Sequence, residues 1–350
     1  MILFPAQAAW LVPAALVLSV LASWAALRYA RWRRMLDLPG RRRSHAGVIP
    51  RGGGAAIVLT LLLGLPWLGW GGQGVLAAAF AVALLAVAGI GWMDDHRPLS
   101  ARMRLAVHMA AAVLCTLALP LAVAEGALWL QAVLLLIGVF WLSGCINAWN
   151  FMDGSNGMVT IQCGWLGLAL AGVFVQIAGD GQLMAWPWAL LSLLLASACS
   201  GFLPFNFPRA TIFLGDVGSG ALGLVCGVLL WAAWGLSPSW FWCLLLLPSA
   251  LLVDAGLTLA WRILCGRRWY TAHREHLYQW LIRAGASHAQ VALMYLGWNL
   301  AVVLPACITI RRWPALAPLI TVLVLALAAA LWWYGKRGAR RRVRNRGSTG

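Results

Sequence analysis

Two adjacent carboxylates, Asp94 and Asp95, follow an apolar stretch of the sequence. Neighbouring carboxylates repel each other, so such a pair typically shares a cation or a proton. The competing interpretation is an ordinary helix end, neutralised by Arg97, Arg102 and Arg104. Taken alone, the pair leaves both a catalytic and a structural role open.

Three amides and one acid lie within residues 147–157, between two apolar stretches. Asn147, Asn150 and Asp153 are spaced three residues apart, and on a helical turn they share one face. Asn156 follows in an Asn-Gly pair. Burying four such groups without partners is costly, and a simple turn needs only Asp-Gly or Asn-Gly. We therefore interpret this segment as part of a binding or catalytic site.

A glycine-rich bend at 213–220 carries a single carboxylate, Asp216, directly before an apolar stretch. Glycine permits close approach of the backbone, and the N–H groups at a helix N-terminus bind phosphate. Mg²⁺ binds through one or two carboxylates together with water and substrate phosphates. Asp216 is therefore a candidate ligand for Mg²⁺, although Gly-Asp-x-Gly alone is a common loop pattern.

The polar segment 270–276 contains His273, Arg274 and His276. Two histidines three residues apart could form half of a zinc site, but no third ligand of suitable spacing is near. We favour contacts with phosphate or sugar groups, and a solvated basic loop is the alternative.

The composition defines the elements that must position these residues. Of the 350 residues, 63% are hydrophobic and only 10% are charged, and the mean hydropathy is +0.83. Soluble domains carry about 25% charged residues, so the sequence excludes a soluble enzyme and a disordered chain. It predicts an all-α, polytopic transmembrane helical bundle, with about 20 apolar residues in each span. Eleven candidate spans are expected at about 6–28, 53–70, 74–92, 105–123, 128–146, 158–178, 184–204, 218–236, 239–261, 290–310 and 315–334.

Basic residues indicate the orientation of these spans. With the N-terminus outside, 24 of the 26 Lys and Arg residues fall in cytoplasmic segments, and only Arg311 and Arg312 fall outside. This distribution predicts an outside N-terminus and a cytoplasmic C-terminus. A nucleic-acid partner is not expected, because it would require a basic face on a soluble domain.

The same orientation places most of the acids and histidines on the cytoplasmic side. Glu125 and Asp180 lie in outside loops, and His108 lies one turn into a span. Asp254 lies inside the span 239–261, where a charge is costly and should face the bundle interior. Its role, structural or functional, stays open. We expect one transmembrane catalytic domain over 1–335, with its site on the cytoplasmic loops. A basic, disordered tail over 336–350 is expected to lie against anionic membrane lipid.

Five blocks, matched in order between about residues 37 and 280, carry a resemblance to a known family. They are Asp37-x-Pro39 through Arg43-Ser44-His45 to Pro50-Arg51-Gly52-Gly53; Asp94-Asp95; Asn147-x-x-Asn150-x-x-Asp153-Gly154-x-x-Gly157; Phe205-Asn206 with Phe213-Leu214-Gly215-Asp216-x-Gly218-Ser219; and His273-x-x-His276. In these blocks the sequence resembles the polyprenyl-phosphate N-acetylhexosamine-1-phosphate transferases, a membrane family that includes phospho-MurNAc-pentapeptide translocase. Each block is modest alone, but all five in order on one membrane face are highly specific.

The resemblance implies that a UDP-N-acetylhexosamine, 6-deoxy sugars included, gives its sugar-1-phosphate to undecaprenyl phosphate and releases UMP. It implies that Mg²⁺ is required, with Mn²⁺ as an alternative, and a homodimer is compatible with it. The implied catalytic residues are Asp94, Asp95 and Asp153, and which aspartate is the base stays open. The implied metal ligands are Asp216 and Asn150. The implied substrate-binding residues are His45, Asn147, Asn156, Asn206, His273, Arg274 and His276.

Departures from the family pattern bear on the substrate. Arginines replace a lysine before His45, His-Arg-Glu-His replaces a denser histidine cluster, and the lysine after the aspartate pair is missing. These differences argue against a MurNAc-pentapeptide donor and favour the branch that initiates O-antigen synthesis in the bacterial inner membrane. The alternative is a transporter or flippase of a lipid-linked or nucleotide sugar. Transport sites lie near the membrane midplane, where this sequence has only Asp254.

Overall fold

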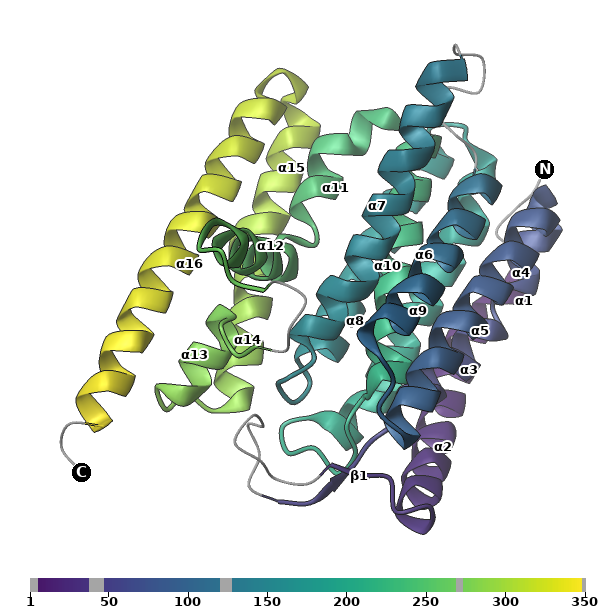
Figure 1. The fold of residues 1–350 in the computed structure, drawn as a ribbon. Coiled ribbons are helices and arrows are strands. Elements are labelled where there is room, and N and C mark those ends of the chain that lie inside the picture. Colours follow the sequence, from purple (N-terminus) through teal and green to yellow (C-terminus); the bar gives the residue numbers. More distant parts are fainter. Residues whose placement is uncertain (1–5, 38–46, 120–127, 269–272, 348–350) are drawn as a thin grey trace.

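The computed structural model describes residues 6–37, 47–119, 128–268 and 273–347 of the chain. Within these ranges the protein is a bundle of helices, with one pair of very short strands at its lower end (Figure 1). The N-terminal helices lie on one flank of the bundle and α16 lies on the other. The predicted all-α, polytopic class is confirmed.

The elements follow one another along the described chain with short connections. They are α1 (Ala6–Ala9), α2 (Leu11–Trp32), β1 (Leu36–Asp37), β2 (Ile49–Pro50), α3 (Ala55–Leu62), α4 (Pro66–Leu68), η1 (Gly69–Gln73), α5 (Gly74–His96), α6 (Ala101–Ala118), α7 (Leu128–Met152), α8 (Met158–Gly179), η2 (Leu183–Ala185), α9 (Trp186–Asn206), α10 (Asp216–Leu236), η3 (Pro238–Trp240), α11 (Phe241–Leu246), α12 (Ser249–Leu264), α13 (Leu277–Arg283), α14 (His288–Trp298), η4 (Asn299–Val303), α15 (Leu304–Arg312), η5 (Pro314–Leu316) and α16 (Ala317–Gly347).

In the described ranges, nine helices are long and apolar enough to cross a membrane. A tenth is added if Pro238–Leu246 and Ser249–Leu264, which are bent by 70° relative to each other, form one span. The predicted span 53–70 contains only the shorter apolar segment Ala55–Leu68, which Pro66 interrupts because proline does not continue a helix. The structure therefore gives nine or ten spans where the sequence suggested eleven. Which membrane face each end meets stays a prediction.

Helix α10 lies at the centre of the bundle, packed against α5, α7 and α8. Of its most apolar 18-residue window, 94% is buried. A Cβ added at Gly223 would lie 2.6 Å from the carbonyl oxygen of Cys145 on α7, so glycine allows these two backbones to approach closely. Because α10 begins at Asp216, this packing fixes the place of that carboxylate.

The short strands connect two of the sequence blocks. β1 and β2 are antiparallel, with Asp37 opposite Ile49. Beyond this pair, Phe213 N donates to Pro50 O at 2.8 Å, and Gly53 N donates to Phe213 O at 2.9 Å. The N-terminal loop is thereby tied to the bend that precedes α10.

The expected disordered tail is wrong for residues 336–347, which continue α16 as a helix. Lys336 and Ala339 are buried, because this end of α16 packs against α13. The guanidinium of Arg340 lies 5.1 Å from the ring of Trp280 on α13. At about 1.5 Å per residue, α16 is roughly 47 Å long, so it extends beyond a hydrocarbon core of about 30 Å.

Candidate active site

A cavity of about 190 Å³ lies where the ends of α5, α7 and α10 meet the connecting loops. It brings together residues from all the sequence blocks apart from His273-x-x-His276, and α13 and α14 add one side chain each. Its lining is Asp37, Arg51, Asp95, Asp153, Gly154, Ser155, Asn156, Asn206, Phe213, Gly215, Asp216, Gln279 and His288.

Asp95 binds the N-terminus of α10. Its side chain is 2% exposed, Oδ1 accepts from Asp216 N at 3.2 Å, and Oδ2 accepts from Val217 N at 3.2 Å. The N-terminus of a helix favours a negative charge, and Arg51 Nε lies 3.8 Å from Oδ1. Gly215 has φ of +76°, and a Cβ there would collide with the Asp95 carboxylate. Glycine is therefore required where this carboxylate meets the bend.

Asp94 and Asp216 are joined by one guanidinium. Arg104 Nη1 donates to Asp94 Oδ2 at 3.1 Å and to Asp216 Oδ2 at 2.5 Å. Asp94 Oδ1 also accepts from Leu99 N at 2.6 Å. Ser100 caps α6 through its hydroxyl, which accepts from Met103 N, and so places Arg104 on the first turn. From the sequence, Arg104 was considered only as a residue that neutralises an ordinary helix end. In the structure it connects two sequence blocks, through Asp94 and Asp216.

Asp153 follows α7 and lines the same cavity. In the described part of the chain, no group donates a hydrogen bond to its carboxylate. Burial raises the pKa of Asp153 well above its ordinary range, and the nearby Asp216 and Asp95 act in the same direction. A carboxylate so placed gains most from a bound cation or a proton.

The donor set suits a hard divalent cation held partly by substrate. Across the described residues, no three His, Cys, Asp or Glu side chains form a ready metal cluster. Mg²⁺, however, needs only one or two carboxylates when water and phosphates complete its shell. Asp153, which accepts no hydrogen bond from any described residue, and Asp216, which is 30% exposed, fit that requirement. Asn150 donates to Ser219 Oγ at 3.1 Å, on the first turn of α10.

The other predicted amides are held by the protein itself. Asn147 Nδ2 donates to Ser143 O at 2.8 Å within α7, away from the cavity lining. Asn206 is 4% exposed; its Oδ1 accepts from Gly157 N at 2.9 Å and its Nδ2 donates to Ile212 O at 3.1 Å. Asn206 thus ties the loop before α8 to the loop before α10. Asn156 lines the cavity.

The histidine block lies beside the cavity and not in its lining. The rings of His273 and His276 are 4.9 Å apart, and His276 is 2% exposed. Burial, together with the nearby His276 and Arg262, lowers the pKa of His273 to about 4. Burial also lowers the pKa of His276. Both imidazoles are therefore neutral at pH 7, so they offer hydrogen bonds and not positive charge. His45 lies outside the described residues.

Helix α13 is the link between this block and the cavity. Tyr278 OH donates to Phe151 O at 3.1 Å, and a Cβ at Gly154 would collide with that hydroxyl. Gln279 Nε2 donates to Tyr278 OH at 3.1 Å, and Gln279 lines the cavity. The sequence did not predict roles for Gln279, His288, Arg51 or Arg104. Their signal was their place beside the recognised blocks, except for His288, which follows the last block at a distance.

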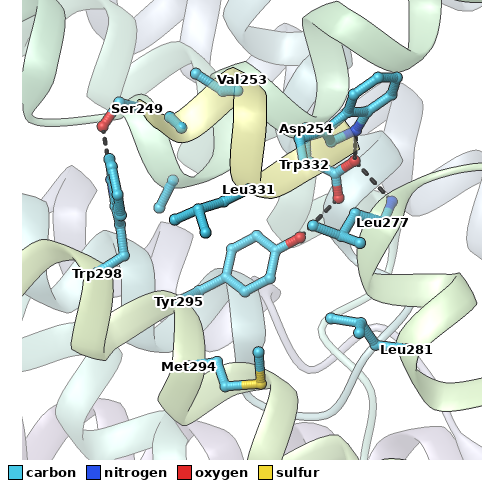
Figure 2. A pocket seen from close by; sticks show the side chains of 12 residues that line it. Ser249, Val253, Asp254, Leu277, Leu281, Met294, Tyr295, Trp298, Leu331 and Trp332 are labelled. Carbon is cyan, nitrogen blue, oxygen red and sulfur yellow. Dashed lines mark hydrogen bonds between the residues drawn. The ribbon is translucent and has the colours of Figure 1, made fainter. Parts of the chain in front are cut away.

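A second pocket, of about 120 Å³, lies among α12, α13, α14 and α16. Figure 2 shows its mostly apolar walls and the carboxylate of Asp254 at one end. That carboxylate accepts from Tyr295 OH at 2.8 Å, Trp332 Nε1 at 3.0 Å and Leu277 N at 2.7 Å. The intramembrane acid therefore faces the bundle interior, as the sequence predicted.

Comparisons with known proteins agree with the geometry. Residues 77–233 match the profile of glycosyl transferase family 4. The chain is 31% identical to the decaprenyl-phosphate N-acetylglucosaminephosphotransferase of Mycobacterium leprae, over 74% of this chain and 73% of that protein. It is 27% identical to a probable undecaprenyl-phosphate N-acetylglucosaminyl 1-phosphate transferase of Bacillus subtilis, over 74% and 73%. It is 29% identical to the phospho-N-acetylmuramoyl-pentapeptide-transferase of Acaryochloris marina, over 69% and 67%.

With three acids, Arg51 and the glycine-rich bend gathered at one cavity, and with relatives aligned over about three quarters of its length, this chain belongs to glycosyl transferase family 4.

Proposed function

We propose that the protein transfers an N-acetylhexosamine-1-phosphate from a UDP-sugar to undecaprenyl phosphate. The general reaction, sugar-1-phosphate transfer to a polyprenyl phosphate, is the one that the names of its relatives in Mycobacterium leprae and Bacillus subtilis describe. The observation that carries the proposal is the cavity where Asp95, Asp153 and Asp216 meet Arg51. Such a site suits phosphoryl transfer, in which positioning and charge neutralisation supply most of the catalysis.

In the proposed reaction, an oxygen of the carrier phosphate forms a bond to the phosphorus that bears the sugar. The bond from that phosphorus to the bridging oxygen breaks, and UMP leaves with the electron pair. Asp216 and Asp153 would hold Mg²⁺, which neutralises phosphate charge when it is bound. Arg51 and Arg104 are placed to donate charged hydrogen bonds to phosphate oxygens.

The acid pair has two different environments in this scheme. Asp95 keeps α10 and Asp216 in place, and its carboxylate lines the cavity. Asp94 is 14% exposed and shares Arg104 with Asp216. We assign Asp94 to orienting the carrier phosphate through Arg104, and Asp95 to holding the site that receives it.

Further parts of the proposal rest on the sequence pattern. The positive-inside distribution supports a site on the cytoplasmic face of the bacterial inner membrane. The departures in the histidine block support an N-acetylated donor of the O-antigen initiating branch, 6-deoxy sugars included. The remaining substrate contacts predicted at His45, Asn147, Asn156, Asn206, His273, Arg274 and His276 belong to the same proposal.

A radiometric assay tests the reaction. The purified protein in detergent receives undecaprenyl phosphate, Mg²⁺ and one labelled UDP-N-acetylhexosamine at a time. We expect one donor to give both UMP release and label in the lipid phase, and excess EDTA to abolish both signals. If no donor gives either signal while the folded protein binds undecaprenyl phosphate, the proposed function is wrong.

Replacing the proposed metal ligand tests the site. We expect Asp216→Asn to lose turnover by at least about 100-fold, because it removes a charge used mainly in the transition state. Asp180→Asn, the same change at an exposed loop, is the matched control and should keep full turnover. Near-normal turnover of Asp216→Asn would contradict the metal assignment.

A further inference from the structure

The turn that carries Asp153 is held by a residue remote in sequence. Helix α7 ends at Met152, and the last carbonyl groups of a helix have no partner within it. Asp153 N donates to Asn150 O at 3.3 Å, and Tyr278 OH on α13 donates to Phe151 O at 3.1 Å. A tyrosine 127 residues from its acceptor thus closes the end of α7, directly before Asp153.

The direction of this hydrogen bond follows from the neighbouring amide. His276 N donates to Gln279 Oε1 at 3.3 Å, and a backbone N–H can only donate. Gln279 Nε2 is therefore the end of the amide that faces Tyr278, and it donates to the tyrosine oxygen at 3.1 Å. The hydroxyl proton of Tyr278 is then available for Phe151 O. The hydroxyl group accepts one bond and donates another, which fixes its orientation.

Gly154, the residue after Asp153, packs on the same hydroxyl group. A Cβ at Gly154 would collide with Tyr278 OH, although the backbone of Gly154 does not lie in the left-handed region. The contact, and not the backbone conformation, therefore requires glycine here. Tyr278 is fully buried, and its own N–H donates to Asp254 Oδ2 at 3.2 Å. The hydroxyl is thus a fixed surface against which the turn packs.

We propose that Tyr278 is a positioning residue for Asp153, because its hydroxyl group holds the backbone on both sides of that carboxylate, at Phe151 and at Gly154. No described residue donates a hydrogen bond to the Asp153 side chain, so its place in the cavity depends on this backbone. The inference rests on the proposed function, which gives Asp153 its metal-binding role. Tyr278 is not part of the cavity lining and acts through Asp153.

The first test removes the hydroxyl group and keeps the ring. We expect Tyr278→Phe to lower kcat by at least about tenfold, because small misplacements of reacting groups are costly. The KM for undecaprenyl phosphate should stay within about threefold. Binding of Mn²⁺, used as a probe of the metal site and followed by electron paramagnetic resonance with UDP present, should weaken by about threefold or more.

Tyr295→Phe is the matched control. Tyr295 is also buried, but its hydroxyl donates to Asp254 Oδ2 at 2.8 Å instead of to α7. The control loses one buried hydrogen bond as well, so it should melt at a lower temperature, with kcat and Mn²⁺ binding within about twofold of wild type. A purely structural role of Tyr278 predicts this same result for Tyr278→Phe, and that result would overturn the inference.

The contact with Gly154 gives a second test at an exposed turn. In the wild-type background, the added methyl group of Gly154→Ala should displace the turn from Tyr278 OH and lower kcat by at least about tenfold. In the Tyr278→Phe background that oxygen is absent, and the same change should cost less than about threefold, since contacting residues are not additive. Equal losses in both backgrounds would contradict the inference.

The two tests separate this inference from the proposed function. If Tyr278→Phe does not fold, Gly154→Ala alone decides, and wild-type kcat with wild-type Mn²⁺ binding in that variant would overturn the positioning role. The transferase assignment would then still stand on wild-type turnover. Absence of turnover with every donor in the wild-type protein would count against the proposed function instead, and Mn²⁺ binding by the variants would still test the role of Tyr278.

Discussion

Two buried aspartates, Asp95 on α5 and Asp254 on α12, bind a helix N-terminus in the same way in the two halves of the bundle. Asp95 accepts from the first two N–H groups of α10. Asp254 accepts from the first two N–H groups of α13, Leu277 N at 2.7 Å and Tyr278 N at 3.2 Å. Asp95 lies 121 residues before the start of α10, whereas Asp254 lies on the helix directly before α13, and both side chains are 2% exposed.

The two carboxylates differ in what else they accept. Asp254 takes three further hydrogen bonds, from Thr258 Oγ1, Tyr295 OH and Trp332 Nε1, so that five donors meet one carboxylate. Figure 2 shows the bonds from Tyr295, Trp332 and Leu277. Asp95 has the Arg51 guanidinium at 3.8 Å as its other partner, and it lines a polar cavity. A carboxylate has about four acceptor sites, so Asp254 is saturated by the protein and Asp95 has capacity left for substrate.

A buried aspartate bound to the first two N–H groups of a helix, which we call an anchor, therefore serves two purposes. At α10 it positions a helix end and still contributes to the site. At α13 it positions the helix that carries Tyr278 and Gln279 to the cavity, and it contributes nothing to the chemistry directly. Breaking each anchor should consequently give a different loss, in turnover for the first and in stability for the second.

The largest effect is expected for Asp95→Asn. Its amide oxygen can still accept from one of the two N–H groups of α10, but the negative charge in the cavity is lost, and turnover should fall by at least about 100-fold. The radiometric assay measures the change, and the melting temperature should fall less than that of Asp254→Asn, because one N–H group loses its acceptor here whereas several donors lose theirs at Asp254. A large loss of stability with intact turnover would show that Asp95 is structural, which contradicts the role given to it in the comparison with Asp254.

A smaller effect on turnover and a larger one on stability are expected for Asp254→Asn. Its amide NH₂ would face donors that then lack an acceptor, at about 1–3 kcal/mol for each buried group left unpaired. The free energy of unfolding should therefore fall by at least about 2 kcal/mol, measured by denaturant titration in detergent. Turnover under stabilising conditions should fall by no more than about tenfold. Wild-type stability in this variant would show that the five donors are satisfied elsewhere.

The smallest effect is expected for His273→Gln, in the way that stability near α13 depends on pH. The pKa of His273 is lowered by burial to about 4, so the unfolded chain binds this proton more tightly than the folded one. Stability must then rise with pH between about 4 and 6.5. We expect His273→Gln to flatten the dependence of the melting temperature on pH in this window. An unchanged slope would place the acid sensitivity on another group, such as His276.

Most of the bundle could be predicted, because apolar runs of about 20 residues have no other stable arrangement. The exceptions are local. Proline at 66 shortens one apolar segment, and the helix following Pro248 leaves its predecessor at 70°. Residues 336–347 look disordered by charge, yet contacts with Trp280 and Thr258 keep them helical. Periodicity does not reveal such contacts, because their partners are remote in sequence.

The candidate site also has a part that the sequence could predict and a part that depends on packing. The structure places Asp95, Asp153 and Asp216, which the sequence blocks suggested as one site, around one cavity, because each block ends or begins a helix at the same end of the bundle. The burial of His276 beside the cavity and of Asn206 in its lining could not be predicted, since burial depends on which helices cover them. Arg104 was visible in the sequence, but only the packing of α6 against α5 and α7, which both contact α10, makes it a bridge.

The bond from Trp332 to Asp254 has a consequence for the order of synthesis. Trp332 follows Asp254 by 78 residues, so the ribosome delivers α12 and α13 well before the donor that completes their anchor. Helices that precede α12, including α5 and α10, can bring the acidic residues together while the chain is still growing. The carboxylate that binds the N-terminus of α13, the helix that carries Gln279, receives its last donor only when α16 has entered the bundle.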